Sequence, residues 1–436
     1  EAAGITAYHV ARPATPLDLF LDGNEGAVPP ADLLATLPPL MPDVVRRYPD
    51  RRPLEARLAQ RLNVAPAQVI VTGGGDDALD RICRAVLAPG RELILPEPTF
   101  EMIPRYARLT GATLVPVPWP DGPYPLDAVL AAVTPRTAAI AVVSPNNPTG
   151  CCATPADLQR LAAAAPHALL IVDLAYVEFA DRDLTPAALA LPNAVIVRTL
   201  SKAWGLAGLR VGYAAGPAAI IDWLRAAGGP YATSGPALAV AAARLADGDA
   251  DMAAFVARIR SERAVLSALL ADLGARPLDS QGNFLFARFT DAAWVRDALA
   301  GHGIAVRHFG DRPALADGLR ITCPGDDAAL QRLTAALRNA LRPQAVLCTL
   351  DVLDPAAVAP LLSLRARAHV RLGVLADGPR AAAAARLATM KLADACDVLV
   401  TADDAPPLPS PAPVQHARAR LGTRHAWLLG GRPAAM

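Results

Sequence analysis

The chain has 436 residues, which is long enough for two or three domains with large buried cores. Charged residues make up 19% of the sequence, below the roughly 25% that is usual for soluble domains, and the formal net charge is only +1. This balance argues against the strongly basic surfaces that bind nucleic acid or an anionic membrane.

From residue 69 to residue 211, short apolar runs alternate with alanine-rich amphipathic stretches. Stretches such as Ala156–Ala165 are predicted helices. The alternation predicts an α/β fold, with a mostly parallel sheet that helices cover on both faces. In such a sheet the site gathers at the carboxyl ends of the strands. The predicted buried strands are Val69–Val71, Glu92–Leu95, Ala139–Val143, Leu169–Val172 and Ala194–Arg198.

A long predicted helix, Met252–Leu270, leads out of this region into a smaller α+β region. Strands are predicted there near Asn283–Ala287, Ala305–Arg307 and Gly318–Thr322. After Pro343 the last segment has its own strand–helix rhythm. The expected parts are an N-terminal arm with a piece of the small domain (1–44), a large domain (45–255), a small α+β domain (256–342) and a C-terminal module (343–436).

Segment 199–210, Thr-Leu-Ser-Lys-Ala-Trp-Gly-Leu-Ala-Gly-Leu-Arg, carries the strongest chemical signal. It places Lys202 among small residues, with Ser201 directly before it and Arg210 eight positions on. This arrangement suits a lysine that reacts covalently with an aldehyde while its neighbours bind a phosphate. The alternative is a strand end with a surface lysine, since most lysines are solvated.

A glycine-rich turn is the second signal. In segment 72–78, Thr-Gly-Gly-Gly-Asp-Asp-Ala, a predicted strand runs into three glycines and then a helix, so backbone N–H groups can face an anion. Gly75 and Asp76 belong to this turn, and Ser201 and Arg210 would complete a phosphate cup. Alone the signal is weak, because the turn is neither GxGxxG nor a Walker loop.

Two further motifs are Ser-Pro-Asn-Asn-Pro-Thr-Gly at 144–150 and Asp-x-Ala-Tyr at 173–176. With Ser-Lys-x-x-Gly-Leu-x-Gly-Leu-Arg-x-Gly from residue 201, they resemble fold-type I pyridoxal-phosphate (PLP) aminotransferases in order and interval. The resemblance is greatest to the histidinol-phosphate aminotransferases and spans residues 5–341. It implies the fold-type I architecture, with a mostly parallel seven-stranded sheet in the large domain, and PLP as the cofactor.

The chemistry of PLP gives these side chains candidate roles. Asp173 can keep the pyridine nitrogen protonated, and Tyr176 and Asn147 can donate to the ring oxygen. Phe100 can stack on the ring face. Taken singly, Asp173, Tyr176 and Asn147 are more simply a capping aspartate, a half-buried tyrosine and a turn asparagine, and Phe100 could equally be a core aromatic. Lys202 would capture the aldehyde and then, as a neutral amine, move the proton of the substrate carbon.

The resemblance also implies residues for substrate and subunit contacts. Arg307, Arg320 and Tyr8 match residues that hold the anionic group of the substrate, together with Asn147. Tyr48, in Arg-Arg-Tyr-Pro-Asp, matches a tyrosine that reaches the cofactor phosphate of the partner subunit, which implies a homodimer with shared sites. The simpler interpretation is a turn tyrosine. No metal ligands are implied.

The expected function is transfer of an amino group between an anionic amino substrate, histidinol-phosphate-like, and a 2-oxo acid. Leu174, Gly26 and Phe100 depart from the family pattern, so a different amino acid or amino alcohol is an open possibility for the substrate. Two further hypotheses for the function are a PLP-dependent decarboxylase resembling threonine-phosphate decarboxylase and a non-catalytic binding protein.

The segment from Ala345 to Leu353 resembles the opening strand of haloacid-dehalogenase-type phosphatases. Thr349 stands where that family has its nucleophilic aspartate, Ala376 where it has a phosphate-binding hydroxyl, Leu408 where it has a lysine and Gly431 where it has a metal-binding aspartate. Without these groups phosphoryl transfer has neither covalent chemistry nor a metal site. The resemblance implies a truncated Rossmann-like module that is catalytically inactive.

The six cysteines include no pair with CxxC spacing, so reduced thiols in a cytoplasmic protein are the expected state. The start of the chain has no basic-then-apolar signal segment, and no run of about 18 apolar residues predicts a membrane span. We therefore expect a cytoplasmic enzyme whose partners are small molecules and a second copy of the chain, with neither nucleic acid nor membrane bound.

Overall fold

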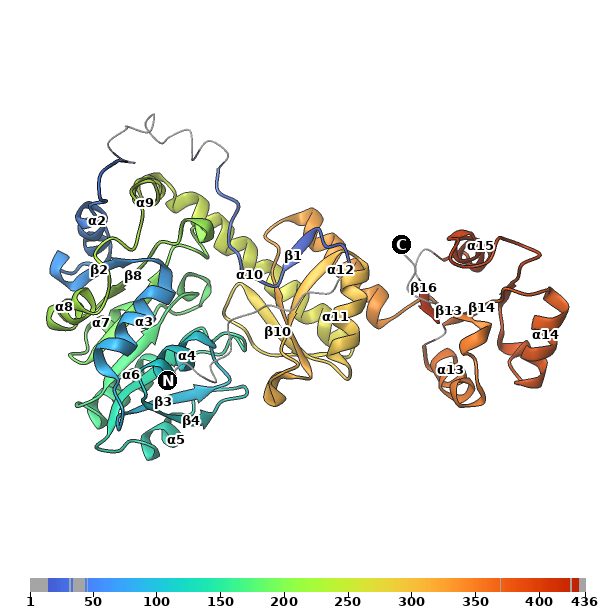
Figure 1. The fold of residues 1–436 in the computed structure, drawn as a ribbon, viewed down its shortest axis with the longest axis horizontal. Coiled ribbons are helices and arrows are strands. Elements are labelled where there is room, and N and C mark those ends of the chain that lie inside the picture. The colour runs from blue at the N-terminus through green and yellow to red at the C-terminus, as the bar shows by residue number, and fades with distance from the viewer. Residues whose placement is uncertain are drawn as a thin grey trace. The chain divides into compact units, whose positions relative to one another are not determined.

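The computed structural model describes residues 15–30, 33, 44, 46–368, 370–423 and 426–430. The chain forms two compact units, Glu1–Leu330 and Gln331–Met436, and Figure 1 labels many of their elements. Tyr8 and Gly431 lie outside the described residues. Among the helices that the structure describes, none combines the length and the apolar character that crossing a membrane requires.

The first unit contains the predicted sheet. In the described part of the chain seven strands form it: β2 (Val69–Thr72), β3 (Glu92–Glu97), β4 (Thr113–Pro118), β5 (Thr137–Val143), β6 (Leu169–Asp173), β7 (Ala194–Thr199) and β8 (Gly212–Ala215). Their order is β2-β8-β7-β6-β5-β3-β4. Every neighbouring pair is parallel except those of β8, which is antiparallel to β2 and β7. The mostly parallel sheet is confirmed, and β5 and β6 are buried along their whole length.

Helices follow the strands as the alternating pattern predicts (Figure 1). Helices α3, α4 and α8 share one core with alternate residues of the strands, in which Ile82, Ile103 and Ile221 are fully or almost fully buried. The two helices predicted by range, α6 and α10, differ from the prediction only at their ends. The helices before residue 273 are α2 (Arg52–Leu62), α3 (Gly74–Val86), α4 (Met102–Leu109), α5 (Leu126–Ala131), α6 (Pro155–Ala164), α7 (Thr185–Leu189), α8 (Ala218–Ala226), α9 (Gly235–Asp247) and α10 (Asp249–Asp272).

A smaller sheet follows α10 in the same unit. Its strands among the described residues are β1 (Leu19–Leu21), β9 (Arg276–Pro277), β10 (Phe284–Arg288), β11 (Ile304–His308) and β12 (Gly318–Thr322), in the order β1-β11-β12-β10-β9. The pair β1–β11 is parallel and the other pairs are antiparallel. Helix α11 (Ala292–Gly301) connects β10 to β11. The three strands predicted here are confirmed, and β1 adds a strand from the N-terminal part of the chain.

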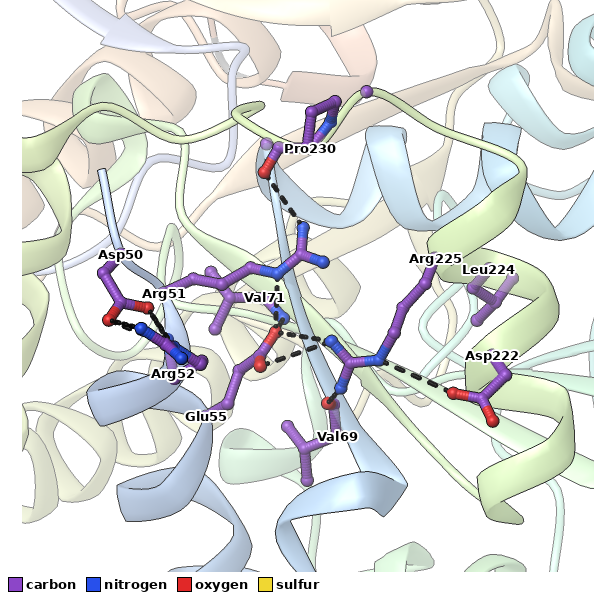
Figure 2. Close-up of polar contacts among 12 residues, drawn as sticks. Asp50, Arg51, Arg52, Glu55, Val69, Val71, Asp222, Leu224, Arg225 and Pro230 are labelled. Carbon is purple, nitrogen blue, oxygen red and sulfur yellow. Dashed lines mark hydrogen bonds and ion pairs between the residues drawn. The ribbon is translucent and has the colours of Figure 1, made fainter. Parts of the chain in front are cut away.

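Strand β2 lies at the edge of the large sheet, where its outward backbone groups have no neighbouring strand to bond. Side chains take that place, as Figure 2 shows. Val71 N donates to Glu55 Oε1 at 3.0 Å, and Arg225 Nη2 donates to Val69 O at 2.6 Å. Arg225 and Glu55 also form an ion pair at 3.4 Å, with the Glu55 side chain only 5% exposed. The edge is therefore closed by a charge network around the buried Glu55.

The second unit contains a smaller sheet of parallel strands. Its strands in the described residues are β13 (Ala345–Thr349), β14 (Arg371–Leu375), β15 (Val398–Val400) and β16 (Ala426–Leu429), in the order β15-β14-β13-β16 and all parallel. Its helices include α13 (Pro355–Ala368), α14 (Arg380–Thr389) and α15 (Ala412–Leu421), and α12 (Asp327–Leu341) contains the boundary between the units. Val346 and Leu347 belong to two separate cores, with Leu387 and with Leu421 respectively. The predicted strand–helix rhythm is confirmed.

Candidate active site

The predicted site residues gather at the carboxyl ends of β5, β6 and β7. Asp173 is the last residue of β6, and it pairs with Val143 of β5 and Val197 of β7. Asn147 follows β5 and Lys202 follows β7. Because these three strands are parallel and adjacent, the loops that follow them meet at one edge of the sheet. The motifs that are separate in the sequence thus form one site.

The amine of Lys202 lies inside this site. Its Nζ donates to the backbone oxygen of Gly23 at 3.3 Å and lies 5.7 Å from the centroid of the Tyr176 ring. Burial lowers the pKa of Lys202 to about 8, and the positive charge of Arg320 is a second cause. A large share of the amine is therefore neutral near pH 8, as a nucleophile or a base requires.

The carboxyl group of Asp173 is only 4% exposed and accepts a hydrogen bond from Ala175 N at 3.0 Å. Burial raises the pKa of Asp173 to about 7, and the charge of Asp76 raises it further. A buried carboxyl of this kind is stabilised in its charged form by a cation brought beside it. A protonated pyridine nitrogen is such a cation.

The hydroxyl of Tyr176 is held by a network that reaches the small sheet. Asn24 Nδ2 donates to Tyr176 Oη at 3.1 Å, and Thr322 Oγ1 donates to Asn24 Oδ1 at 2.9 Å. Asn283 Nδ2 donates to the backbone oxygens of Asn24 and Glu25 at 3.3 and 3.2 Å. Since Tyr176 accepts from Asn24, its own O–H proton remains to be donated. Burial also raises the pKa of Tyr176, which keeps that proton in place.

The segment after Asn24 passes directly against the lysine loop. A Cβ on Gly26 would lie 1.5 Å from the backbone oxygen of Lys202, and a Cβ on Gly205 would lie 2.3 Å from the backbone oxygen of Ala27. Gly205 also has φ +75°, which favours glycine. Gly26, which departs from the family pattern, is therefore required by this close approach.

The glycine turn of the predicted phosphate cup lies at the start of α3. Gly73 N donates to Asp77 Oδ2 at 2.9 Å, and Arg210 Nη2 pairs with Asp76 Oδ2 at 3.0 Å. A Cβ on Gly74, which has φ +84°, would lie 2.8 Å from Arg210 Nη2. The glycine thus lets the guanidinium approach the first turn of the helix, where N–H groups and the helix dipole favour an anion.

Gly75 belongs to this turn, and strand β8 connects the turn to the end of β7, after which Ser201 follows. Thr199 Oγ1 donates to Ser201 Oγ at 2.9 Å, and Ser201 is 5% exposed. A Cβ on Gly212 of β8 would lie 2.6 Å from Gly75 N, so β8 and the start of α3 are in close contact. The elements that carry Ser201 and Arg210 are thereby brought to the glycine turn.

Arg81 connects the first turn of α3 to the loop after α8. Sequence reasoning did not identify this residue. It is 1% exposed, and its Nε donates to Asp77 Oδ1 at 2.9 Å while its Nη2 donates to Gly229 O at 2.8 Å. A Cβ on Gly228 would lie 2.1 Å from Arg81 Cζ. The Arg81 guanidinium therefore occupies the space that a side chain at Gly228 would need, and its bond to Asp77 holds the first turn of α3 in place.

Tyr48 does not line the site of its own chain. Its side chain is 79% exposed, and its ring stacks on Tyr231 with centroids 4.4 Å apart. Arg51 ties the two segments together, since its Nε pairs with Glu55 Oε1 at 3.0 Å and its Nη1 donates to Pro230 O at 3.2 Å (Figure 2). The exposed ring is thus held in a fixed position at the surface.

A cavity of about 130 Å³ opens beside Lys202. Arg320, which is 7% exposed, donates from Nη1 to Asn147 Oδ1 at 2.6 Å and from Nη2 to Asp22 O at 2.5 Å. The cavity therefore contains both predicted arginines next to the lysine. Its described lining residues are Asp22, Gly23, Thr99, Phe100, Glu101, Asn147, Pro148, Tyr176, Lys202, Arg307, Phe309, Arg312 and Arg320.

The lining residues that have no counterpart in the sequence prediction include Glu101, Phe309 and Arg312. Glu101 forms ion pairs with Arg307, at 3.4 Å, and with Arg312. Glu101 directly follows the predicted Phe100, but the only signal for Arg312 is its position five residues after Arg307. No local pattern marks either residue as part of the site.

These residues fit PLP. The chain supplies an amine that is neutral near pH 8 for the aldehyde, a buried carboxyl for the ring nitrogen, and a cradle at Gly74 that leaves no room for a Cβ. Tyr176 and Asn147 supply donors nearby. Within the described ranges, no three His, Cys, Asp or Glu side chains come together in a way that could hold a metal ion.

Comparisons with known proteins give the same picture. The family described as aminotransferase class I and II matches residues 21–337. Histidinol-phosphate aminotransferase of Xanthomonas euvesicatoria is 38% identical over 340 residues, 74% of this chain and 90% of that protein. Aromatic amino acid aminotransferase of Mycobacteroides abscessus is 37% identical over 308 residues, 68% of this chain and 86% of that protein.

Among solved structures, histidinol-phosphate aminotransferase from Sinorhizobium meliloti, in complex with pyridoxal-5'-phosphate, superposes with a TM-score of 0.67 at 29% identity. The match covers 76% of this chain and 92% of that chain. The family match ends at residue 337, within α12.

Proposed function

This chain belongs to the class I and II aminotransferases, which are PLP-dependent enzymes, and we propose that it moves an amino group between an anionic amino substrate and a 2-oxo acid. The amino substrate is an amino acid or a phosphorylated amino alcohol of the histidinol-phosphate kind. One observation carries the proposal: the Lys202 amine shares a small cavity with Arg307 and Arg320. Guanidinium groups hold phosphate or carboxylate by paired hydrogen bonds.

Bound PLP supplies an aldehyde for covalent capture of the substrate amine and a ring that takes up electrons. Lys202 would hold the aldehyde, and its neutral amine could then take the proton from the substrate carbon and return it one position away. Asp173 would keep the ring nitrogen protonated. Tyr176 and Asn147 would donate to the ring oxygen, and Arg320 would orient the substrate.

The phosphate of the cofactor has its own set of groups. We assign it to the N–H groups of Gly75 and Asp76, the hydroxyl of Ser201 and the guanidinium of Arg210. The exposed Asp76 carboxylate now paired with Arg210 would turn aside as the phosphate binds. Phe100, which lines the cavity, would stack on the ring face.

We propose a cytoplasmic homodimer. Tyr48 is exposed yet held by the Arg51 contacts, and such a ring is placed to reach the cofactor phosphate of a partner subunit. Tyr8, from the N-terminal arm, would join Arg307 and Arg320 at the substrate. The division into an arm (1–44), a large domain (45–255), a small domain (256–342) and a module (343–436) also stays a prediction.

A donor screen tests the proposal. The purified holoenzyme is mixed with 2-oxoglutarate and single amino donors, including histidinol phosphate, histidinol, phenylalanine and alanine, and glutamate formation is followed. We expect kcat/KM for the best anionic donor to exceed that for histidinol, an amine without an anionic group, by about 100-fold, since a buried arginine–anion pair contributes about 3 kcal/mol. Release of CO2 without glutamate would support the decarboxylase hypothesis, and no turnover with any donor would contradict aminotransfer.

We propose that the second unit is a shortened haloacid-dehalogenase-type module without phosphatase activity. Thr349 ends β13 and is 5% exposed, and a Cβ on Gly430 would lie 2.3 Å from its Oγ1. At the start of α14, Arg380 N donates to Asp403 Oδ2 at 2.9 Å, so a carboxylate occupies the position at which a phosphate would bind. Leu408 packs against an apolar core.

Deleting the residues after Arg342 should leave transamination within about twofold of the full chain, the range expected when no site residue is touched. The family match ends before this point. The rate is compared for both proteins at equal PLP occupancy, with the oligomeric state measured in parallel. Loss of activity in a truncated protein that stays folded and dimeric would show that the module has a functional role.

A further inference from the structure

The arginines of the cavity cluster around one aromatic ring. The Phe309 side chain is 4% exposed, and its ring centroid lies 5.2 Å from Arg307 Cζ, 5.7 Å from Arg312 Cζ and 5.9 Å from Arg320 Cζ. Cation–π contact stabilises each guanidinium, but the three positive charges repel one another at these distances. Such a cluster is stable only when anionic groups lie between its members.

Glu101 is the anionic side chain that contacts two members of this cluster. Its Oε1 lies 3.4 Å from Arg307 Nη2, and its Oε2 pairs with Arg312 Nη2. The side chains of Glu101 and Arg307 are 16% and 11% exposed, so water screens this pair weakly. Arg312 is also fixed by its donation to Thr99 O at 3.5 Å. Glu101 thus covers the faces with which Arg307 and Arg312 would bind an oxyanion.

The charges of the lining residues favour an incoming anion. The described lining contains two acidic residues, Asp22 and Glu101, against the three arginines, before Lys202 is counted. If a ligand group with more negative charge took the place of the Glu101 carboxylate at Arg307 and Arg312, the net charge of the cavity would come closer to zero. A phosphate monoester carries nearly two negative charges and three acceptor oxygens at neutral pH, and so can bond both guanidinium groups at once.

We propose that Glu101 and Arg312 determine substrate specificity, with Glu101 acting as an internal counter-ion that the phosphate group of the substrate displaces from Arg307 and Arg312. Substrate groups that are uncharged or only weak hydrogen-bond acceptors cannot displace a carboxylate that is already paired with arginine. The cavity therefore selects for substrates that carry a strong oxyanion. The inference rests on the proposed aminotransferase function and deepens it, because it assigns the anion-binding end of the same cavity to two residues that no motif marks.

The test measures binding of inorganic phosphate to the holoenzyme by calorimetry at fixed ionic strength, without any amino donor. In the holoenzyme the cofactor occupies the phosphate cup, so added phosphate reports on the arginine cluster. We expect Glu101→Gln to tighten phosphate binding about tenfold and Arg312→Met to weaken it about tenfold, as expected for the removal of one partly buried charge. Asp127→Asn, which removes an exposed charge on α5, is the matched control and should leave phosphate affinity unchanged.

Weaker or unchanged phosphate binding in Glu101→Gln would overturn the proposal, because Glu101 would then serve only to hold the arginines in place. Unchanged binding in Arg312→Met would overturn it as well. Thermal unfolding of each variant shows whether the fold is retained, and the two substitutions predict opposite shifts, which a general loss of structure cannot produce. Failure of aminotransfer is seen separately, as absence of turnover in the wild type, while the phosphate measurements still report on Glu101.

Discussion

Replacing Lys202 with alanine is expected to lower the rate of amino transfer by about 10⁴-fold or more, since the change removes both the covalent anchor and the proton-transfer base. The structure gives the reason. The amine lies beside Tyr176 in a cavity that lowers its pKa to about 8, and the described lining residues include no other lysine. The measurement is the single-turnover rate with an excess of amino donor and PLP.

The chain allows an unusually clean control, because its only two lysines are Lys202 and Lys391. Lys391 is exposed and belongs to the second unit. Borohydride reduction should fix the pyridoxyl group on Lys202 in the wild type and in Lys391→Arg, and on neither lysine in Lys202→Ala. Labelling of Lys391 in the wild type, with Lys202 unmodified, would refute the assignment.

The pH dependence of cofactor capture follows from the same lysine. Because its pKa is lowered from 10.5 to about 8, the neutral fraction of the amine rises as the pH approaches 8 and changes little well above it. The rate of PLP attachment to the apoenzyme should level off just above this pH. A rate that still rises steeply towards pH 10 would show an ordinary, solvated lysine.

The arrangement of the proposed cofactor residues could be predicted from the sequence because two simple regularities coincide. The strands that carry them are apolar along almost their whole length, as Leu169–Asp173 illustrates, so they identify a sheet buried on both faces. Adjacent parallel strands end at the same edge, so Asn147, Asp173 and Lys202 had to meet. The motifs therefore indicated both the fold and the position of the site.

The anion-binding end could be predicted only in part. Arg307 and Arg320 were found by resemblance, but the Arg312–Glu101 pair joins residues 211 positions apart and has no local signature. The Asn24–Thr322 bonds span 298 positions. Such contacts depend on how the small sheet packs against the loops that follow the strands of the large sheet. No hydrophobic periodicity or motif in either segment predicts this packing.

Gly26 shows a different limit. In the sequence it was a departure from the family pattern that weakened the histidinol-phosphate interpretation. In the structure it is the residue that lets the segment after Asn24 pass against the backbone of Lys202. The close approach is between segments more than 170 positions apart, so the need for glycine there appears only when both are in place.

Asp173→Asn is expected to lower the transamination rate by about 10²–10⁴-fold, because it leaves the protonated ring nitrogen without its buried anionic partner, a loss of about 3–5 kcal/mol. The amide keeps the shape of the side chain and can still accept from Ala175 N, so a large loss would come from charge rather than from packing. PLP affinity should fall with the rate. Asp127→Asn, an exposed replacement of the same kind, should change neither.

Stability of the apoenzyme provides a second readout that does not require turnover. The pKa of Asp173 is raised from 3.8 to about 7 in the folded chain, so between these values the folded state binds more protons than the unfolded state. The contribution of Asp173 is therefore fully present below pH 4 and is lost as the pH rises towards 7. Asp173→Asn removes this dependence. The free energy of unfolding of the variant should therefore rise relative to that of the wild type as the pH increases from about 4 to about 7. Parallel pH profiles for the two proteins would mean that the carboxyl is solvated and is not the group that holds the ring proton.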